Sequence, residues 1–301
     1  MEIWLLFIII AYLFFAIGSF GDKLVLAGKP KPKSYTFYMG MFGLSVLLLL
    51  PFTKFGLPTG IGLFWVMLDA FVHILGIYTM YVALEKFDVS RVIATIGATQ
   101  PIFIFALTWI FFGPQSMTIA DIVAFVLLFI GSVIISIEKN IELTEDYLKI
   151  TIFSSLMFSL DYVFLKFVFL HQSFLLGIIW VGIFIFLFST VFLISKKSRH
   201  EIFARKMVTN KKTQSAFLLA QLSGGVANFL QGRAIFLAPA GVLAIINSLK
   251  GVQYAFLFAI TIFVSFLYPK LLKEEISKKI VIQKAISIVF IAIGLYILVK
   301  Y

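Results

Sequence analysis

The sequence predicts an all-α integral membrane protein in which ten transmembrane helices form two inverted five-helix repeats. Hydrophobic residues make up 61% of the 301 residues and charged residues 13%, and the mean hydropathy is +1.07. That composition excludes a soluble domain with a polar shell. Apolar runs of about 18 or more residues recur along the chain, and each can cross a hydrocarbon core of about 30 Å as a helix. A weak similarity between the two halves predicts the repeat.

The apolar runs define the expected spans. The first is preceded by Glu2 instead of a basic segment, so we expect it to be a mature helix and not a secretory signal. With 36 Phe in the chain, we expect helices to pack mainly through bulky side chains and less through close glycine contacts. The expected spans are residues 3–21, 35–52, 61–84, 92–112, 118–137, 150–170, 173–195, 214–236, 242–267 and 280–299.

Positive charge is concentrated in alternate loops. The formal net charge is +11, and 20 of the 25 Lys and Arg residues lie in five segments. The opposite loops, with both termini, hold only Lys54 and Lys300. The positive-inside rule therefore predicts a multi-pass plasma-membrane protein with both termini outside. The segments expected in the cytoplasm are residues 22–34, 85–91, 138–149, 195–212 and 268–284.

This distribution explains the net charge by membrane orientation and lipid head groups, so no nucleic acid partner is expected. The chain has no cysteine, which excludes disulfides and thiol chemistry, and its three histidines lie in different segments. We therefore expect no metal and no other cofactor. The expected partners are the lipid bilayer, a small-molecule substrate and a coupling proton, with the chain acting as a monomer or homodimer.

Internal similarity places the first repeat at residues 3–137, a linker at residues 138–148 and the second repeat at residues 149–299. FAIGSFGDKLVL aligns with FSLDYVFLKFVFL, so that Lys23 falls on Lys166. In the fourth helix of each repeat, the pair Gln100 and Pro101 falls on Lys250 and Gly251. Because five helices are an odd number, tandem copies enter the membrane from opposite sides, as in many secondary transporters.

The same segments carry a family resemblance that covers nearly the whole chain. GSFGDKLVL resembles the opening helix of EamA-type permeases of the drug/metabolite transporter superfamily, and IATIGATQPIFIFALTWIFFG resembles their fourth helix. KEEISKKIVIQKAISIVFIAIGLYIL resembles the end of each repeat. The chain departs from the family pattern at Pro114 and Gln115, where an acidic residue is usual, and at Gly251, where the helix-four proline is usual. The resemblance implies a permease, and relatives often have both termini in the cytoplasm, unlike the charge count here.

Among the ionisable residues inside apolar spans, four stand out, because each needs a partner, a cavity or a ligand. Asp69 and His73 are four residues apart on one helix face, so the carboxylate can hold the imidazole in a proton relay. The structural alternative is that Asp69 lies near the surface or only caps a neighbouring helix. Asp161 is expected either in the same ion-coupling group or in a salt bridge with Lys166 or Lys250.

Lys250 is the fourth ionisable residue, at about 12 Å depth in its expected helix. Asn247, Gly251 and Tyr254 share its side of that helix, and Gly251 is expected to leave room beside the amine. The NSLK segment, residues 247–250, partly matches the organophosphate and nucleotide-sugar branches of the superfamily, and this resemblance implies substrate contact by Lys250. The alternative is a purely structural ion pair.

Amides and hydroxyls complete the expected substrate site. The expected eighth helix carries a polar stripe, Gln221, Gly224, Asn228 and Gln231. These residues either form hydrogen bonds between helices or line a cavity. Thr99 and Gln100 are the helix-four counterparts of the Lys250 group, although such threonines often bond only to their own helix. The expected substrate-binding residues are Lys250, Asn247, Gln253, Tyr254, Gln221, Asn228, Gln231, Gln100 and Thr99; the expected proton-coupling or ion-pair residues are Asp69, His73 and Asp161.

No catalytic or nucleotide-binding motif is found, so neither catalysis nor ATP-driven transport is expected. We expect a secondary active permease that moves a small polar or anionic metabolite by alternating access through a central cavity. One alternative is a membrane enzyme acting on lipid, with Asp69 and His73 as the general base. The other is a non-transporting scaffold in which the buried charges pair with one another.

Overall fold

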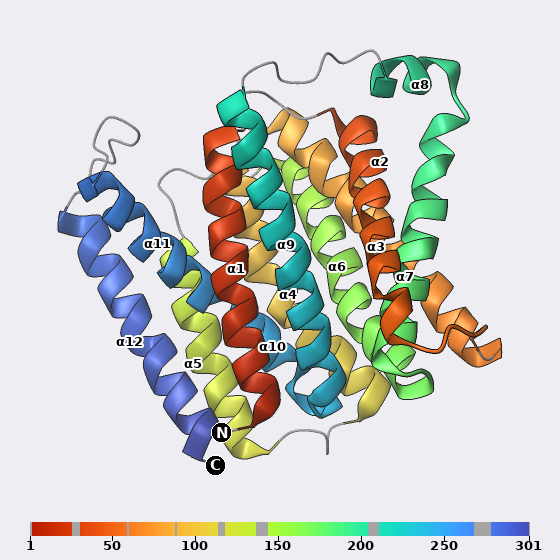
Figure 1. Cartoon of the computed structure of the whole chain (residues 1–301). Coiled ribbons are helices and arrows are strands. Elements are labelled where there is room, and N and C mark those ends of the chain that lie inside the picture. The colour runs from red at the N-terminus through yellow and green to blue at the C-terminus, as the bar shows by residue number, and fades with distance from the viewer. Residues whose placement is uncertain are drawn as a thin grey trace. The chain divides into compact units, whose positions relative to one another are not determined.

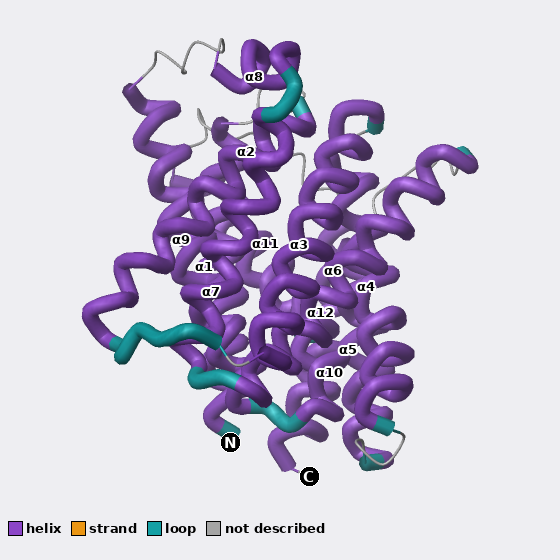
Figure 2. Tube along the Cα trace, turned by 90° about the vertical axis from the view of Figure 1, so that its right-hand side faces the viewer, coloured by secondary structure: helices purple, strands orange, loops and turns teal. Residues whose placement is uncertain are grey.

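The computed structural model describes residues 2–25, 31–58, 60–87, 89–113, 118–136, 144–203, 211–267 and 278–300. Every regular element in these ranges is a helix, as Figure 2 shows. Eight of the described helical segments are long and apolar enough to cross a membrane, and the helix at Ile119–Ile135 is apolar but shorter. The expectation of an all-α membrane protein is therefore confirmed.

The helices follow the apolar runs closely (Figure 1). Three expected spans are each divided into more than one helical element: the second (residues 35–52), the seventh (173–195) and the ninth (242–267). In chain order the elements are α1 (Ile3–Val25), α2 (Pro32–Gly43), η1 (Leu44–Phe52), α3 (Gly60–Lys86), α4 (Val89–Phe112), α5 (Ile119–Ser136), α6 (Glu145–His171), α7 (Phe174–Ser189), η3 (Thr190–Leu193), α8 (Lys196–Phe203), α9 (Lys211–Leu237), η4 (Ala240–Val242), α10 (Leu243–Ser248), α11 (Lys250–Leu267) and α12 (Lys278–Lys300).

Local sequence signals fix several helix ends. Thr144 caps α6, because its side chain accepts a hydrogen bond from the Tyr147 amide, and two acidic residues follow in the first turn. Thr118 and Asp121 bond reciprocally at the start of α5 and thus form a capping box. Gly113 has φ +85° directly after α4, the left-handed geometry that commonly ends a helix.

The chain divides into two compact units. The first contains residues 1–27, 108–139 and 208–301, and the second contains residues 28–107 and 140–207. Both units thus take segments from the two sequence halves, and the assignment of residues 3–137 and 149–299 as five-helix repeats stays a prediction. Most of the expected linker, residues 138–148, lies outside the described residues.

In the first unit, α1 lies along α9 and α5 lies along α12, each pair antiparallel (Figure 1). A Cβ on Gly131 of α5 would lie 3.0 Å from the Ser287 carbonyl oxygen, and one on Gly294 of α12 would lie 3.2 Å from that of Ala124. These glycines therefore allow the two backbones to approach closely.

In the second unit, α3 lies along α6, and α2 packs against α7. A Cβ on Gly40 would lie 2.2 Å from Ser189 Oγ, and one on Gly182 would lie 2.6 Å from the Gly43 carbonyl oxygen. The expectation that helices pack mainly through bulk is therefore wrong for this pair. Gly40, Gly43 and Gly182 stand at the points where α2 and α7 touch.

Gly182→Ala is expected to destabilise the protein by about 1–3 kcal/mol, because a methyl group cannot fit against the Gly43 carbonyl without backbone movement. Thermal melting in detergent micelles measures this. Gly225→Ala on α9 is the matched control, because nothing lies within 4 Å of its Cβ position. It is expected to be neutral or slightly stabilising, and equal losses in both variants would contradict the described α2–α7 packing.

The expected basic loop at residues 195–212 contains α8, a short amphipathic helix. Ser198 and Ile202 are buried, while Lys197 and Arg199 are exposed. Two bonds hold α8 to α2: Lys33 donates to Ser198 Oγ at 3.3 Å, and Tyr38 donates to the Ile202 carbonyl at 2.8 Å. The cations of α8 are thus presented outward from a fixed helix.

Candidate functional site

The expected ninth helix is broken immediately before Lys250. The helix α10 ends at Ser248 and α11 begins at Lys250, with Leu249 as a turn between them. The span expected at residues 242–267 is present as the candidate span Ala240–Val264, but its helix is not continuous as we expected. A break inside an apolar segment leaves backbone groups without helical partners, and these groups require other partners away from water.

Two neighbouring helices of the first unit supply those partners. Ser132 of α5 donates to the Ser248 carbonyl at 2.5 Å and accepts from the Gly251 amide at 2.9 Å, so one hydroxyl bridges the break. Tyr12 of α1 donates to the Ile246 carbonyl at 2.6 Å. A Cβ at Gly251 would lie 2.5 Å from Ser132 Oγ, so Gly251 makes room for this hydroxyl. The space at Gly251 therefore does not serve the Lys250 amine, which is the role that we expected from the sequence.

Ser132→Ala is expected to cost about 1–3 kcal/mol of stability, because it leaves a buried carbonyl and a buried amide unpaired. Ser248→Ala is the control, since that hydroxyl bonds only within its own helix, to the Ala244 carbonyl. Melting temperatures in micelles compare the two variants. Equal stability of both would show that the hydroxyl of Ser132 does not hold the break.

Three polar groups around the break have no hydrogen-bond partner among the described residues. Asn247 is 1% exposed and its Oδ1 is unpaired, and the Tyr254 hydroxyl is likewise buried and unpaired. In the described part of the chain no carboxylate pairs with the Lys250 ammonium. An acceptor, a cation and a hydroxyl donor therefore share one short stretch of the first unit. Unpaired buried polar groups are costly, so a ligand that satisfies them gains binding free energy.

The other residues expected in the substrate site of this unit lie differently. Gln253 donates to Ser19 Oγ of α1 at 3.2 Å, so its amide is engaged in helix packing. On α9, Gln221 and Gln231 are half-buried and Asn228 is exposed. A Cβ on Gly224, which lies on the same stripe, would meet nothing within 4 Å. The α9 stripe therefore borders open space at Gly224.

In the second unit, α6 is held to α3 and α4 by a series of side-chain hydrogen bonds. Ser154 donates to the Gly76 carbonyl of α3 at 3.0 Å, and Ser159 donates to the Gln100 carbonyl of α4 at 3.2 Å. Thr99 donates to Ser155 Oγ at 2.8 Å. The expected substrate residues Thr99 and Gln100 thus both contact α6. The Thr99 hydroxyl also lies 2.8 Å from the Thr95 carbonyl of its own helix, the alternative that we considered for it.

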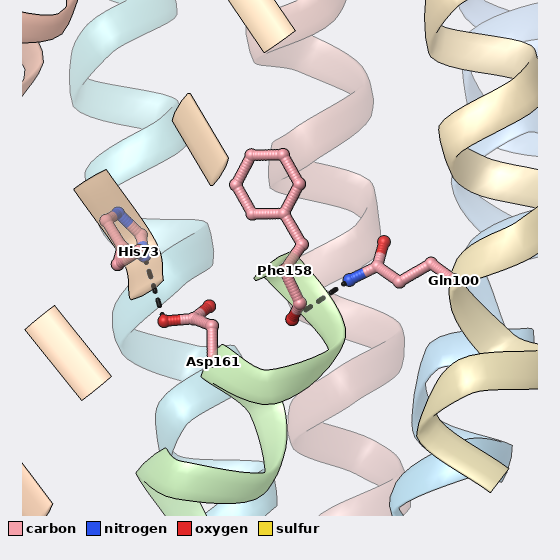
Figure 3. Close-up of polar contacts among 4 residues, drawn as sticks. All are labelled: His73, Gln100, Phe158 and Asp161. Atoms are coloured by element: carbon pink, nitrogen blue, oxygen red, sulfur yellow. Dashed lines mark hydrogen bonds and ion pairs between the residues drawn. The ribbon is translucent and has the colours of Figure 1, made fainter. Parts of the chain in front are cut away.

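His73 pairs with Asp161. Its Nδ1 lies 3.0 Å from Asp161 Oδ1, between α3 and α6. Figure 3 shows His73 reaching α6 from one side, while the Gln100 amide donates to the Phe158 carbonyl from the other at 3.5 Å. The expected pairing of His73 with Asp69 is thereby corrected, because the partner of His73 is Asp161. Of the two alternatives considered for Asp161, the described residues show the contact with the ion-coupling group and not a salt bridge with Lys166 or Lys250. The contact between helices replaces both contacts within a helix.

Asp69 is buried in the same place. It is 1% exposed, and neither of its oxygens accepts a hydrogen bond from a described residue. The carboxyl group that interacts with it is that of Asp161. The side chains of His73 and Asp161 are 29% and 16% exposed, so this group reaches the surface at its imidazole end. All three expected ion-coupling residues therefore meet within the second unit.

Sequence reasoning missed the residues that hold both sites in place. Tyr12, Ser19 and Ser132 are single polar residues in apolar helices, and the serines of α6 were not separated from serines that bond to their own helix. A detectable signal was present on α6, where Ser154, Ser155 and Ser159 recur at helical spacing with Asp161.

An all-helical chain with at least eight apolar spans among its described residues is a multi-pass membrane protein. Residues 2–137 match the model of the EamA-like transporter family. Over these residues the match confirms the family resemblance expected from the sequence. The match indicates a membrane transporter, the class of protein that this family comprises.

The fold agrees with a known crystal structure over nearly the whole chain. One crystal structure of another protein is similar with a TM-score of 0.66, over 97% of this chain and 94% of its own. The two sequences are 13% identical, so the likeness concerns the fold alone. No curated protein sequence matches the chain.

Proposed function

We propose that the protein is a secondary permease that moves a small polar or anionic metabolite across the membrane by alternating access. The observation that carries the proposal is the Lys250 group. Its ammonium has no carboxylate partner among the described residues, and the Asn247 oxygen and Tyr254 hydroxyl nearby are also unpaired. An anionic group that carries hydroxyls would satisfy the cation, the acceptor and the donor together.

The broken helix supports this assignment. Discontinuous helices commonly form the substrate sites of secondary transporters, because the start of the second segment carries free amides and a positive dipole end. Lys250 is the first residue of α11, so its charge adds to that of the helix end. The Gly251 amide already donates to Ser132 Oγ. The Lys250 ammonium is therefore the main group at this helix end that remains available to bind an anion.

We propose further that the chain forms ten spans as two inverted five-helix repeats. The packing within the units supports this. The first helix of each proposed repeat lies along the third helix of the other, as α1 with α9 and α6 with α3. The two second helices, α2 and α7, also pack together, as do the two last helices, α5 and α12. Reciprocal pairing of this kind is expected from an inverted repeat, and it explains why each unit draws on both halves.

Two observations favour a permease over the alternatives. A scaffold would have its buried charges paired with one another, whereas Lys250 has no ionic partner among the described residues. A general base that acts on lipid needs access from the bilayer, whereas Asp69 is 1% exposed.

We propose that the basic loops face the cytoplasm of the plasma membrane and that both termini lie outside. Because the chain has no cysteine, single cysteines report orientation without background. A membrane-impermeant maleimide added to intact cells is expected to label Leu57→Cys and not Lys197→Cys, two positions that are exposed in the structure. Labelling of Lys197→Cys alone would reverse the orientation.

A ligand screen followed by uptake tests the function. A ligand that binds only the folded state raises its melting temperature, so purified protein is melted with carboxylates, phosphate esters and neutral sugars in turn. Compounds that raise it are then offered to liposomes containing the protein, with and without an imposed pH gradient. We expect an anionic compound to stabilise the protein and to enter the liposomes. Stabilisation and uptake confined to uncharged compounds would contradict the proposal.

A further inference from the structure

The Asp69 carboxyl group has an unusual environment for an acid. It is 1% exposed, and neither oxygen receives a hydrogen bond from any described residue. An ionised carboxylate without donors is among the most costly groups to bury. The interacting partner of Asp69 is a second acid, Asp161, which as a carboxylate has no hydrogen to donate. Two ionised acids at close range would also repel each other.

A single proton between the two acids removes both costs. If Asp69 carries it, the Asp69 hydroxyl donates to an Asp161 oxygen. Asp161 Oδ1 lies 3.0 Å from His73 Nδ1, so the Asp161 carboxylate would accept from both sides. A metal ion fits less well, because among the residues that the structure describes no group of three His, Asp or Glu side chains could hold one. A sodium ion would also need several oxygen ligands, whereas a proton needs two.

We infer that Asp69 carries the coupling proton as a neutral acid and exchanges it with the Asp161 carboxylate, which His73 holds in place on its other side. This inference rests on the proposed function and specifies its coupling ion. It also changes the expected roles: His73 becomes the positioning residue, and the proton is shared between two acids on different helices.

The neighbouring helices contribute little other charge at this position. Besides Asp161, α6 carries Lys166 five residues further along, and α7 has no titratable residue between Phe174 and Ser189. On α2, Lys33 and Tyr38 bond to α8, and the Tyr35 ring packs at a tilt against Tyr81 near the end of α3. The balance of charge between α3 and α6 is therefore set chiefly by Asp69, Asp161 and His73.

Proton release would then act on helix packing. When the proton leaves Asp69 for water, two carboxylates face each other and one imidazole remains to compensate them. The repulsion acts across the α3–α6 contact, which otherwise depends on bonds such as Ser154 to the Gly76 carbonyl. Loading and release of the proton would thus favour different arrangements of α3 against α6, as coupling requires.

Infrared spectroscopy of the purified protein at neutral pH tests the inference without any substrate. A buried neutral acid gives the carbonyl stretch of a protonated carboxyl group, which shifts to lower frequency in heavy water. We expect this band in the native protein and in Asp69→Glu, and its loss in Asp69→Asn. Asp146→Asn, at an exposed position on α6, is the matched control and is expected to keep the band. A band that survives Asp69→Asn overturns the inference.

Transport assays separate this result from the proposed function. With a transported compound, Asp69→Asn is expected to keep exchange between equal internal and external substrate while it loses at least tenfold of the uptake driven by a pH gradient. Equal gradient-driven uptake by native protein and Asp69→Asn overturns the coupling role. If no compound is transported, the proposed function fails, whereas loss of the infrared band in Asp69→Asn still supports a proton on Asp69.

Discussion

Lys250→Met is expected to weaken binding of an anionic substrate by about tenfold to a hundredfold and to abolish its uptake. Methionine keeps the length of the side chain but removes the charge, and hydrogen bonds to charged groups contribute about 1.5–3 kcal/mol. The effect is expected on binding and not on folding, because no carboxylate among the described residues depends on this ammonium. Titration of purified protein with the substrate found in the screen measures the affinity.

Lys300→Met at the exposed end of α12 is the matched control, and its affinity and uptake are expected to equal those of the native protein. Lys250→Arg is expected to retain part of the binding, since the charge remains. Native affinity in Lys250→Met, with normal binding in both controls, would remove Lys250 from the substrate site.

The second large effect is expected at the contact between α3 and α6. Single replacement of His73 or Asp161 by alanine is expected to destabilise the protein by about 1.5–3 kcal/mol, because each removes a charged hydrogen-bond partner and leaves the other partly buried. The double variant is expected to lose less stability than the two single variants together, and the difference is a coupling energy of about 1–3 kcal/mol. Reversible unfolding in mixed micelles measures all four free energies.

A second double-mutant cycle, between Asp69 and His73, distinguishes the observed pairing from the one that we expected from the sequence. Its coupling energy should be smaller, since His73 Nδ1 lies 3.0 Å from Asp161 Oδ1, whereas neither oxygen of Asp69 accepts a hydrogen bond from a described residue. Asp146→Ala controls for the loss of an acid from α6. A larger coupling for Asp69 with His73 than for Asp161 with His73 would contradict the described geometry.

The helices were predictable from the sequence because hydrocarbon leaves few alternatives for an apolar run of twenty residues. Span ends at Ile3, Phe112 and Leu267 agree with the expected limits. The break at Leu249 was not predictable, because its cause lies on other helices. The hydroxyls of Ser132 and Tyr12 donate to backbone carbonyls beside the break and so stabilise a non-helical turn there. Helical propensity and hydropathy depend on the local sequence alone and take no account of hydrogen-bond partners on other helices.

The sequence was enough to predict which residues form the candidate sites, but not which of these residues contact one another. Burial cost alone identified Asp69, His73, Asp161 and Lys250 as residues that need partners. The spacing of four residues suggested Asp69 with His73, yet helix periodicity reports only neighbours on the same helix. The partner of His73 depends on which face α6 turns toward α3, and this follows from packing at contacts such as Gly76 against Phe158.

Simultaneous measurement of substrate and proton movement tests the central claim most directly. Liposomes containing the protein and an internal pH-sensitive dye are given the anionic substrate identified in the screen. We predict that native protein moves protons together with the substrate, that Lys250→Met moves neither, and that Asp69→Asn exchanges substrate without moving protons. Substrate-linked proton movement that persists unchanged in Asp69→Asn, or substrate uptake that persists unchanged in Lys250→Met, would contradict the account.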